Sequence, residues 1–487
     1  METIHSEKNE RLVDEVDNEA GEIIGIHQDT KVIRRKLDFY LLPLLISGFF
    51  VLQLDRSNIS NALTDTITED LGITTDDVNL GNQLMSAGIA IAEIPSNIIL
   101  QRFGASKWLT FQMLVWGTVA ICQAWVTNIH SFYATRFLLG LFEGGYIPGA
   151  MYMLALFYTK SELAVKTSVF YFGNYVAAAV GPLVAAGILQ MAGLGGLSGW
   201  QWLFIIEGGI TLLIFLVFVL FLPRSPAHTR PIHGLWDFFS EDERKLLRAR
   251  IVADDEYNEA DKVSMSFRDV KDSIVDYRLW LHMLLNIVTL TPKGGLQLYG
   301  PLVIKTLGFS KVNANLLSAV SSVLVLIFSY CISIVSDRTR WRGPFCILAF
   351  AWSIIFAGSV LGVSKDASAS KWTLYAVFTL LSGGNAVSQS LNDAWVSINA
   401  RSPSRRSLGL AMVVMGSNFG GIIGPQLFRS SDAPKYPHAF LAILVLYAAA
   451  IPITLLMMWV YSRDNKEAQT PGTTHDGTLE TRRRYDL

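Results

Sequence analysis

The chain alternates between long apolar runs and short clusters of charged residues. The apolar runs are about 20 residues long, which is the length that an α-helix needs to cross the hydrocarbon core of a bilayer. Runs such as LLIFLVFVLFL do not alternate polar with apolar positions, as the strands of a membrane barrel do. A helix satisfies its own backbone hydrogen bonds in lipid, so the pattern predicts membrane-spanning helices.

Twelve spans are predicted, in two sets of six. Their ranges are 38–60, 80–101, 108–128, 130–158, 165–190, 201–222, 279–305, 312–336, 344–363, 372–398, 406–428 and 437–461. We therefore expect an all-α polytopic membrane protein built from two six-helix bundles. The expected domains are an N-terminal tail 1–36, a first bundle 37–222, a linker 223–278, a second bundle 279–461 and a C-terminal tail 462–487.

Composition agrees with a membrane protein and excludes several other classes. The chain is 51% hydrophobic and 17% charged, against roughly 25% charged residues in soluble domains. The net charge is −1, so no excess of basic residues points to nucleic acid. The sequence shows no metal-binding spacing of cysteine and histidine, no Walker A motif and no pairing of a nucleophile with a base. We expect no enzyme activity, no cofactor and no metal, and we expect a monomer.

The distribution of lysine and arginine predicts the orientation. With the N-terminus inside the cell, the predicted inner segments hold KVIRRK at 31–36, the linker 223–278 and the basic stretch 338–342, and an excess of Lys and Arg is typical of cytoplasmic loops. The predicted outer loop 61–79 has no Lys or Arg and is acidic. Both termini are therefore expected in the cytoplasm. No signal-peptide pattern is visible, and the plasma membrane is the expected location.

The linker 223–278 predicts one amphipathic helix. It opens with LPRSPAHTRP, whose prolines end the preceding helix. Ser240 and Glu243 then form a capping-box pattern, and Leu246, Leu247 and Ile251 supply an apolar stripe. This helix is expected on the inner membrane face, either as a simple connector or as a regulatory element.

The two sets of spans resemble each other internally. The loop QRFGASKW after the second span corresponds to SDRTRWRG after the eighth. The fifth span contains FGNYVAAAVGP and the eleventh GSNFGGIIGP, each with an asparagine, small residues and a final Gly-Pro. Matching interruptions in two halves are typical of transporters built from repeats, whose site lies near the midplane between the halves.

These motifs resemble a known family. The arrangement of spans, with QRFGASK and SDRTR in the inner loops, is similar to the major facilitator superfamily, although Gln101 stands where that motif usually has an acidic residue. LDRSNISNA, EIPSN, RFLLGLFEGGYIPG, GWQWLFIIEG, FLPRSP and SNFGGIIGPQLF followed by DAPKY resemble, in this order, the fungal allantoate permease family of the anion:cation symporter group. The resemblance covers nearly all of 37–461. It implies the facilitator fold and the transport of a small organic anion, such as allantoate or nicotinate, by proton symport. By the same loop motif, Arg102, Asp337 and Arg338 are expected in gating or structural roles.

Arg136 and Glu143 are the main candidate functional pair. They lie seven residues apart in a predicted span, which places them on one helix face about 10 Å apart along its axis. That is too far for a direct salt bridge, so each needs its own partner, and ionisable groups in spans are functional candidates. Gly140, between them, leaves room for a close helix or for a ligand. Arginine keeps its charge and is suited to hold an anion, whereas a glutamate can gain and lose a proton. The resemblance implies these same two roles.

Other polar positions are candidates for the same site. Arg56 matches a substrate-binding arginine of the animal branch, and its alternative role is an ion pair at an outer gate. Asp55 is expected to gate the site and to pair with Arg136 when no substrate is bound. Asn82 matches a pocket histidine of the animal relatives, and helix packing is its alternative role. Glu93 is expected at a gate or helix tether.

The second half contributes further candidates. Lys293, Gln297 and Tyr299 lie in a span interrupted by Pro292 and Pro301 and are expected to face the anion. In the tenth span Asn385, Gln389 and Asn392 follow each other at helical spacing, which predicts one polar stripe toward the cavity, and Asn418 adds another hydrogen-bonding group.

The resulting functional hypothesis is a twelve-helix importer of a small organic anion with a proton. An exporter of a fungal metabolite or drug and a nutrient sensor without transport remain as alternatives. The partners expected are the anion, the proton and the lipid bilayer, with no nucleic acid.

Overall fold

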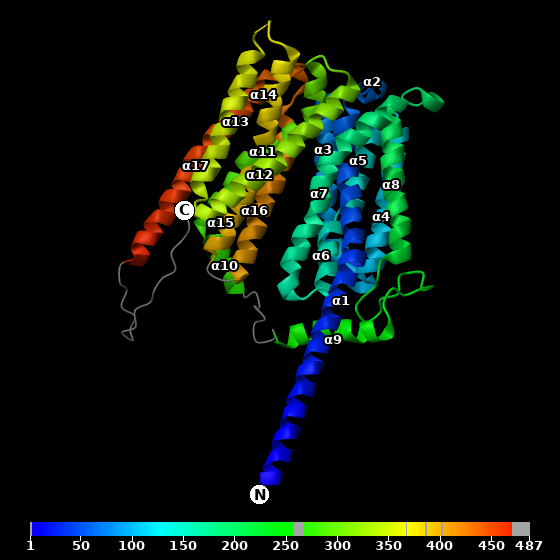
Figure 1. Ribbon diagram of the computed structural model, residues 1–487. Coiled ribbons are helices and arrows are strands. Elements are labelled where there is room, and N and C mark those ends of the chain that lie inside the picture. The colour runs from blue at the N-terminus through cyan, green and yellow to red at the C-terminus, as the bar shows by residue number, and fades with distance from the viewer. Residues whose placement is uncertain (1, 258–266, 367, 385–386, 401–402, 470–487) are drawn as a thin grey trace.

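Two groups of helices stand side by side in the computed structural model, which describes residues 2–257, 267–366, 368–384, 387–400 and 403–469 (Figure 1). The first group comprises α1 Glu2–Ala62, α2 Ile67–Leu71, α3 Thr75–Phe103, α4 Ala105–Cys122, α5 Ile129–Glu143, α6 Tyr146–Phe157, α7 Lys160–Ile188 and α8 Gly199–Phe221. The second group comprises α11 Tyr277–Thr306, α12 Lys311–Thr339, α13 Gly343–Val363, α14 Lys371–Gly384, α15 Val387–Asn399, α16 Pro403–Ile423 and α17 Pro437–Gln469.

Two short helices, α9 Glu241–Tyr257 and α10 Phe267–Val275, lie between the groups in the sequence. They lie near one end of the long helices, and α2 lies near the opposite end (Figure 1). We call these two ends the α9 face and the α2 face. Asn385, a predicted site residue, lies outside the described residues.

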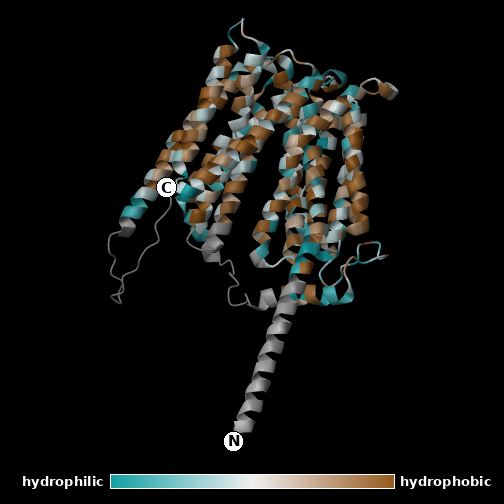
Figure 2. Cartoon of the chain, viewed as in Figure 1, coloured by the Kyte–Doolittle hydropathy of each residue, from teal (hydrophilic) through white to brown (hydrophobic). Residues whose placement is uncertain are grey.

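Helices occur at each of the twelve ranges that the sequence predicts. Eight described helices are long and apolar enough to cross a membrane, or nine if α3, which bends near Pro95, counts as one span. The ranges 108–128, 279–305 and 372–398 are helical but are not among these eight or nine. In Figure 2 hydrophobic colour dominates the long helices, and hydrophilic colour gathers toward their ends.

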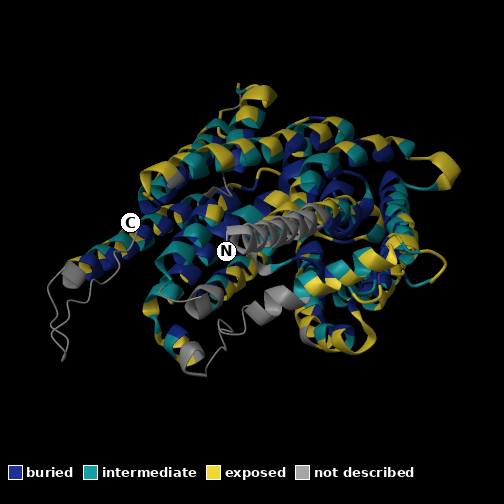
Figure 3. Cartoon of the chain, turned by 60° about the horizontal axis from the view of Figure 1, so that its bottom comes forward, coloured by how far each residue is buried: buried dark blue, intermediate teal, exposed yellow. Residues whose placement is uncertain are grey.

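Within each group, the helices pack in pairs. In the first group α3 packs on α5, α1 on α7 and α4 on α8, and in the second α11 packs on α16, α13 on α17 and α12 on α14. Between the groups, α7 packs on α12 and α1 on α11. One apolar cluster continues across the groups and includes Ile59 and Leu63 of α1 and its end with Leu298 and Val303 of α11. Viewed toward the α9 face, exposed positions are frequent on the outward sides of the helices (Figure 3).

The predicted linker helix forms as α9, and its capping box is present. The backbone N–H of Ser240 donates to the Glu243 carboxylate at 2.7 Å, and the N–H of Glu243 donates to the Ser240 hydroxyl at 3.2 Å. Leu247 is fully buried against the first group. Glu243 also pairs with Lys36 of α1 at 2.6 Å, so the first turn of α9 is fastened to the first group.

Candidate functional site

The predicted span 130–158 is broken immediately after Glu143. Helix α5 ends at Glu143 and α6 begins at Tyr146, with Gly145 in the left-handed region at φ 90°. A broken helix leaves carbonyl groups without partners. Gln112 of α4 meets this need, because its side-chain amide donates to Gly144 O at 2.8 Å and to Phe142 O at 3.1 Å. Glu143 therefore lies at the break between α5 and α6, where a side chain of α4 hydrogen-bonds to the free carbonyl groups.

Arg136 is fully buried, and its hydrogen-bond partner among the described residues is a neutral amide. Its Nη2 donates to Oδ1 of Asn82 on α3. Its Nε and Nη1 are buried without a hydrogen-bond partner among the described residues. A buried guanidinium with unused donors is costly unless it serves an anion.

Glu143 forms an ion pair with Arg56 of α1. The Nε of Arg56 lies 2.6 Å from Oε2 of Glu143, and the carboxylate side chain is 0% exposed. The Arg56 side chain is 23% exposed, so it reaches the pair from a more open side. The prediction that Arg136 and Glu143 have separate partners is thus confirmed for this structure.

Gly140 serves the close approach of two helices. A Cβ atom at Gly140 would lie 2.0 Å from the backbone oxygen of Met85 on α3. A Cβ atom at Gly88 of α3 would also be too close, at 2.5 Å from Phe137 O. Of the two predicted uses of Gly140, a close helix and a ligand, the structure contains the first. This contact brings Asn82 on α3 within reach of Arg136 on α5.

The expected pair between Asp55 and Arg136 is not formed. Asp55 is fully buried and instead accepts a hydrogen bond at 2.7 Å from the hydroxyl of Thr211 on α8. Adjacent helical residues point about 100° apart, so Arg56 can face α5 while Asp55 faces α8. Glu207, one turn before Thr211, is also buried, and neither of its carboxylate oxygens has a hydrogen-bond partner among the described residues.

The second group contributes a cation of its own, on α11. Lys293 donates to Oε1 of Gln389 on α15 at 3.0 Å, so these two predicted site residues meet. Gln297, one turn further along α11, has an exposed side chain. Tyr299 differs from the prediction. It is fully buried, and its hydroxyl donates to Asn79 Oδ1 at 2.6 Å and to Thr75 O at 3.0 Å, because its helix face is turned toward α3.

The remaining predicted residues lie apart from this cluster. Asn392 is buried and bonded to His282 and Asn286, so the predicted polar stripe of the tenth span does not face one cavity along its length. Asn418, Glu93, Arg102 and Arg338 have exposed side chains. The side chain of Asp337 lies outside the described part of the chain.

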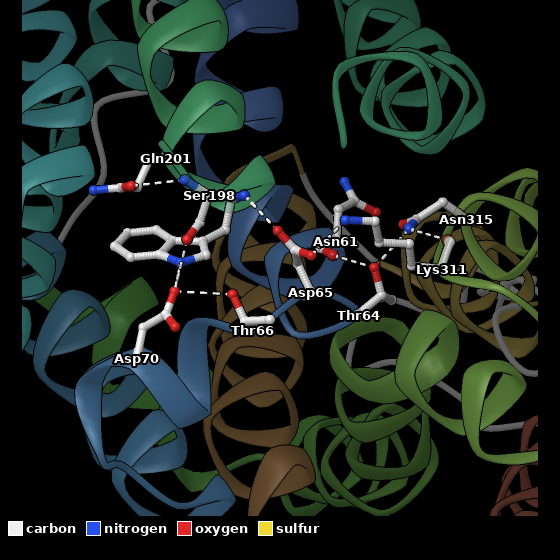
Figure 4. Close-up of polar contacts among 10 residues, drawn as sticks. Asn61, Thr64, Asp65, Thr66, Asp70, Ser198, Gln201, Lys311 and Asn315 are labelled. Atoms are coloured by element: carbon white, nitrogen blue, oxygen red, sulfur yellow. Dashed lines mark hydrogen bonds and ion pairs between the residues drawn. The ribbon is translucent and has the colours of Figure 1, made fainter. Parts of the chain in front are cut away.

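A set of contacts joining the groups at the α2 face was missed from the sequence. Lys311 of α12 pairs with Asp65 at 2.7 Å, and Asn315 donates to the Thr64 hydroxyl at 2.8 Å (Figure 4). We call these two contacts the α2-face latch. The acidic loop 61–79 and the isolated cation Lys311 were visible in the sequence, but 246 residues separate the pair.

The first-group side of the latch is braced by Trp200. Its backbone N–H donates to Asp65 Oδ2 at 2.8 Å, and its indole Nε1 donates to Asp70 at 2.6 Å. Burial raises the pKa of Asp70, but hydrogen bonds from Trp200, Thr66 and Ser198 outweigh it and leave the pKa below its ordinary value. Asp65 therefore offers one oxygen to its own group and the other to the opposite group.

The apolar helices, the two packed groups and the buried charges between helices define a polytopic helical membrane protein of the transporter class. The Major Facilitator Superfamily model matches residues 45–425 and 298–484, and the chain belongs to this superfamily. Its relatives are transporters and not enzymes.

Individual proteins agree with this assignment. An uncharacterized transporter of Schizosaccharomyces pombe is 32% identical over 85% of this chain and 79% of its own length. The major facilitator-type transporter hxnP of Emericella nidulans is 27% identical over 95% of this chain and 93% of its own. Among solved structures, a bacterial homologue of the human lysosomal transporter Spinster has a TM-score of 0.67 at 13% identity and covers 87% of this chain and 97% of that chain. A D-xylose–proton symporter has a TM-score of 0.63 at 17% identity, covering 86% and 97%. These similarities support the fold of a small-molecule transporter embedded in a membrane.

Proposed function

We propose that this chain imports a small organic anion together with a proton by alternating access. Arg136 holds the anion, and Glu143 carries the proton. The observation that carries the proposal is the unequal partnering of the two arginines. Arg56 is paired with a carboxylate, whereas the buried Arg136 contacts a neutral amide and keeps two nitrogens without partners among the described residues.

Coupling follows from competition for Arg56. While Glu143 is ionised, it occupies Arg56 at 2.6 Å. When Glu143 takes up a proton, the attraction that holds Arg56 is lost, and Arg56 can turn to the anion beside Arg136. Two guanidinium groups suit a carboxylate, because each presents paired donors. Anion binding and protonation of Glu143 therefore favour each other.

Alternating access would open and close the latch. We propose that the α9 face and both termini lie in the cytoplasm and that the α2 face lies outside. We further propose that twelve helices span the membrane in bundles 37–222 and 279–461, and that the protein is a monomer in the plasma membrane. The α2-face latch then closes the outer side in this structure.

The substrate class is supported by resemblance as well as by charge. The motifs are similar to the fungal allantoate permease family, which transports carboxylates and related acids. A protein of Agrobacterium vitis, 28% identical over 90% of this chain, has a name that proposes tartrate as its substrate. A carboxylate that serves as a vitamin or a nitrogen source is consistent with both the family resemblance and the buried arginine.

The test is uptake into proteoliposomes containing the purified protein. An acid outer medium should drive accumulation of labelled organic anions from a panel of carboxylates, and a protonophore should abolish the drive. Uptake that does not depend on the proton gradient would contradict proton symport. Transport restricted to uncharged solutes would contradict the proposal that the substrate is an anion.

A further inference from the structure

A cavity lies between the two helix groups, on the α2-face side of the charged residues. Helices α1, α7, α11, α12 and α14 line it, and among its described lining residues none is charged. Six serines take part: Ser57, Ser60, Ser318, Ser321, Ser322 and Ser382. The side chain of Gln297 also lines it.

The position of the cavity relative to the cations follows from the direction of two helices. Both α1 and α11 run from the α9 face toward the α2 face (Figure 1). On α1 the lining residues begin at Ser57, directly after Arg56, and on α11 they begin at Leu296, three residues after Lys293. The cations therefore form one layer, and the uncharged cavity forms the next layer toward the α2 face.

Four of the six serine hydroxyls, those of Ser57, Ser60, Ser318 and Ser321, already donate to backbone carbonyls. Ser57 donates to Leu54 O at 3.1 Å, Ser318 to Asn315 O at 2.7 Å and Ser321 to Ser318 O at 2.7 Å. A hydroxyl has one proton to donate and two lone pairs to accept with. These serines thus present acceptor lone pairs as their remaining function.

Ser382 adds an independent indication of a ligand. The residue is 7% exposed, and its hydroxyl is buried without a hydrogen-bond partner among the described residues. A buried polar group without a partner costs free energy, so a ligand that supplies the partner gains affinity there.

We infer that this cavity is a subsite for the uncharged end of the transported anion, and that this end carries O–H or N–H donors. The inference rests on the proposed function, in which Arg136 holds the charged end and Arg56 turns to it when Glu143 is protonated. The substrate class is then a small organic acid with hydroxyl, amide or ureido groups, oriented with its carboxylate toward the cation layer and its donors toward the α2 face.

A ladder of four acids on one carbon skeleton tests the inference. Dissociation constants of butyrate, 4-hydroxybutyrate, 3,4-dihydroxybutyrate and 4-methoxybutyrate are measured by calorimetry on the purified full-length protein. Each has one carboxylate and an uncharged far end. The Kd is expected to fall roughly two- to tenfold with each added hydroxyl. 4-Methoxybutyrate keeps the oxygen but lacks the donor, so it should bind like butyrate. Equal binding of the first three acids, 4-methoxybutyrate binding as tightly as 4-hydroxybutyrate, or no binding by any of the four would overturn the inference.

Matched serine variants locate the effect. Ser382→Ala and Ser321→Ala should each reduce the preference for 4-hydroxybutyrate over butyrate. Ser359→Ala on α13 is the control, because Ser359 also donates to a backbone carbonyl of its own helix, Ile355 O at 2.8 Å, but does not line the cavity. A preference that survives both cavity variants would place the donor subsite elsewhere and overturn the assignment.

The results can distinguish a failure of the subsite inference from a failure of the proposed function. Proton-driven uptake of butyrate and 4-hydroxybutyrate at equal affinity would refute the subsite and leave the symport proposal standing. A clear preference for donors with uptake that ignores the proton gradient would refute the symport and support the subsite.

Discussion

Glu143 pairs with Arg56 of a neighbouring helix and not with Arg136, the arginine seven residues before it on the same helix. Helical geometry explains the choice, because two turns separate Arg136 from Glu143 along the axis. The consequence is that one carboxylate serves one arginine while the other arginine keeps unused donors. In the proposed function, anion binding and proton uptake are therefore assigned to two different positions of one broken span.

Replacing Arg136 with lysine should weaken anion binding. Lysine keeps the charge but loses the planar fork, and hydrogen bonds to charged groups are worth about 1.5–3 kcal/mol each. We expect a loss of roughly tenfold or more in affinity, measured by calorimetry with a transported anion. The control is Arg338→Lys, at an exposed position. Near-normal affinity of Arg136→Lys would assign Arg136 to structure alone.

Locking the α2-face latch should stop transport. Thr64 and Asn315 belong to opposite groups and are joined by a hydrogen bond of 2.8 Å. Cysteines at both positions, in a background where Cys122, Cys331 and Cys346 are replaced by serine, should cross-link on oxidation and arrest uptake. A reductant should restore it.

The control cross-link stays within one group. Ser198 donates directly to Asp70 at 2.9 Å within the first group, so cysteines at positions 70 and 198 should cross-link without joining the groups. Transport should continue in that variant. If the cross-group lock leaves uptake intact, the latch does not open during the cycle.

Adding one methyl group at Gly140 should destabilise the protein. A Cβ atom there would lie 2.0 Å from the backbone of Met85, so helices α3 and α5 would have to separate. Overpacking of this kind costs about 1–3 kcal/mol. Thermal unfolding of Gly140→Ala should occur at a lower temperature than that of Gly187→Ala, where nothing lies within 4 Å of the added atom. Equal melting of the two variants would refute the role of Gly140.

Acid should loosen the start of α9. Burial raises the pKa of Glu243, but hydrogen bonds from Lys36 and Ser240 and the charge of Lys36 outweigh it and leave the pKa below the ordinary value of 4.5. A carboxylate with a depressed folded-state pKa stabilises the fold above its ordinary pKa, and that contribution is lost as the pH falls through the depressed value. Hydrogen exchange of residues 241–246 should therefore quicken below about pH 4.5 beyond the intrinsic trend, in which acid slows exchange. Glu243→Gln should remove this extra pH dependence, and an unchanged profile in that variant would show that another group is responsible.

The sequence predicts the helices well because apolar length is a local property. It also predicts the α9 capping box, since Ser240 and Glu243 lie within one turn. The partners of buried charges depend on which helix faces which, and spacing along the chain does not contain that information. Asp55 bonding to Thr211, Tyr299 bonding to Asn79 and Lys311 pairing with Asp65 all join helices distant in sequence. The division into bundles 37–222 and 279–461 and the roles of the site residues stay predictions.

The most direct test of the division of labour is Glu143→Gln in proteoliposomes, assayed in two modes with the same labelled anion. Glutamine fills the same space but carries no exchangeable charge, so accumulation driven by a proton gradient should be lost. Exchange of internal for external anion at equal pH should persist, because Arg136 is intact. Gradient-driven accumulation equal to that of the unmodified protein would contradict the account.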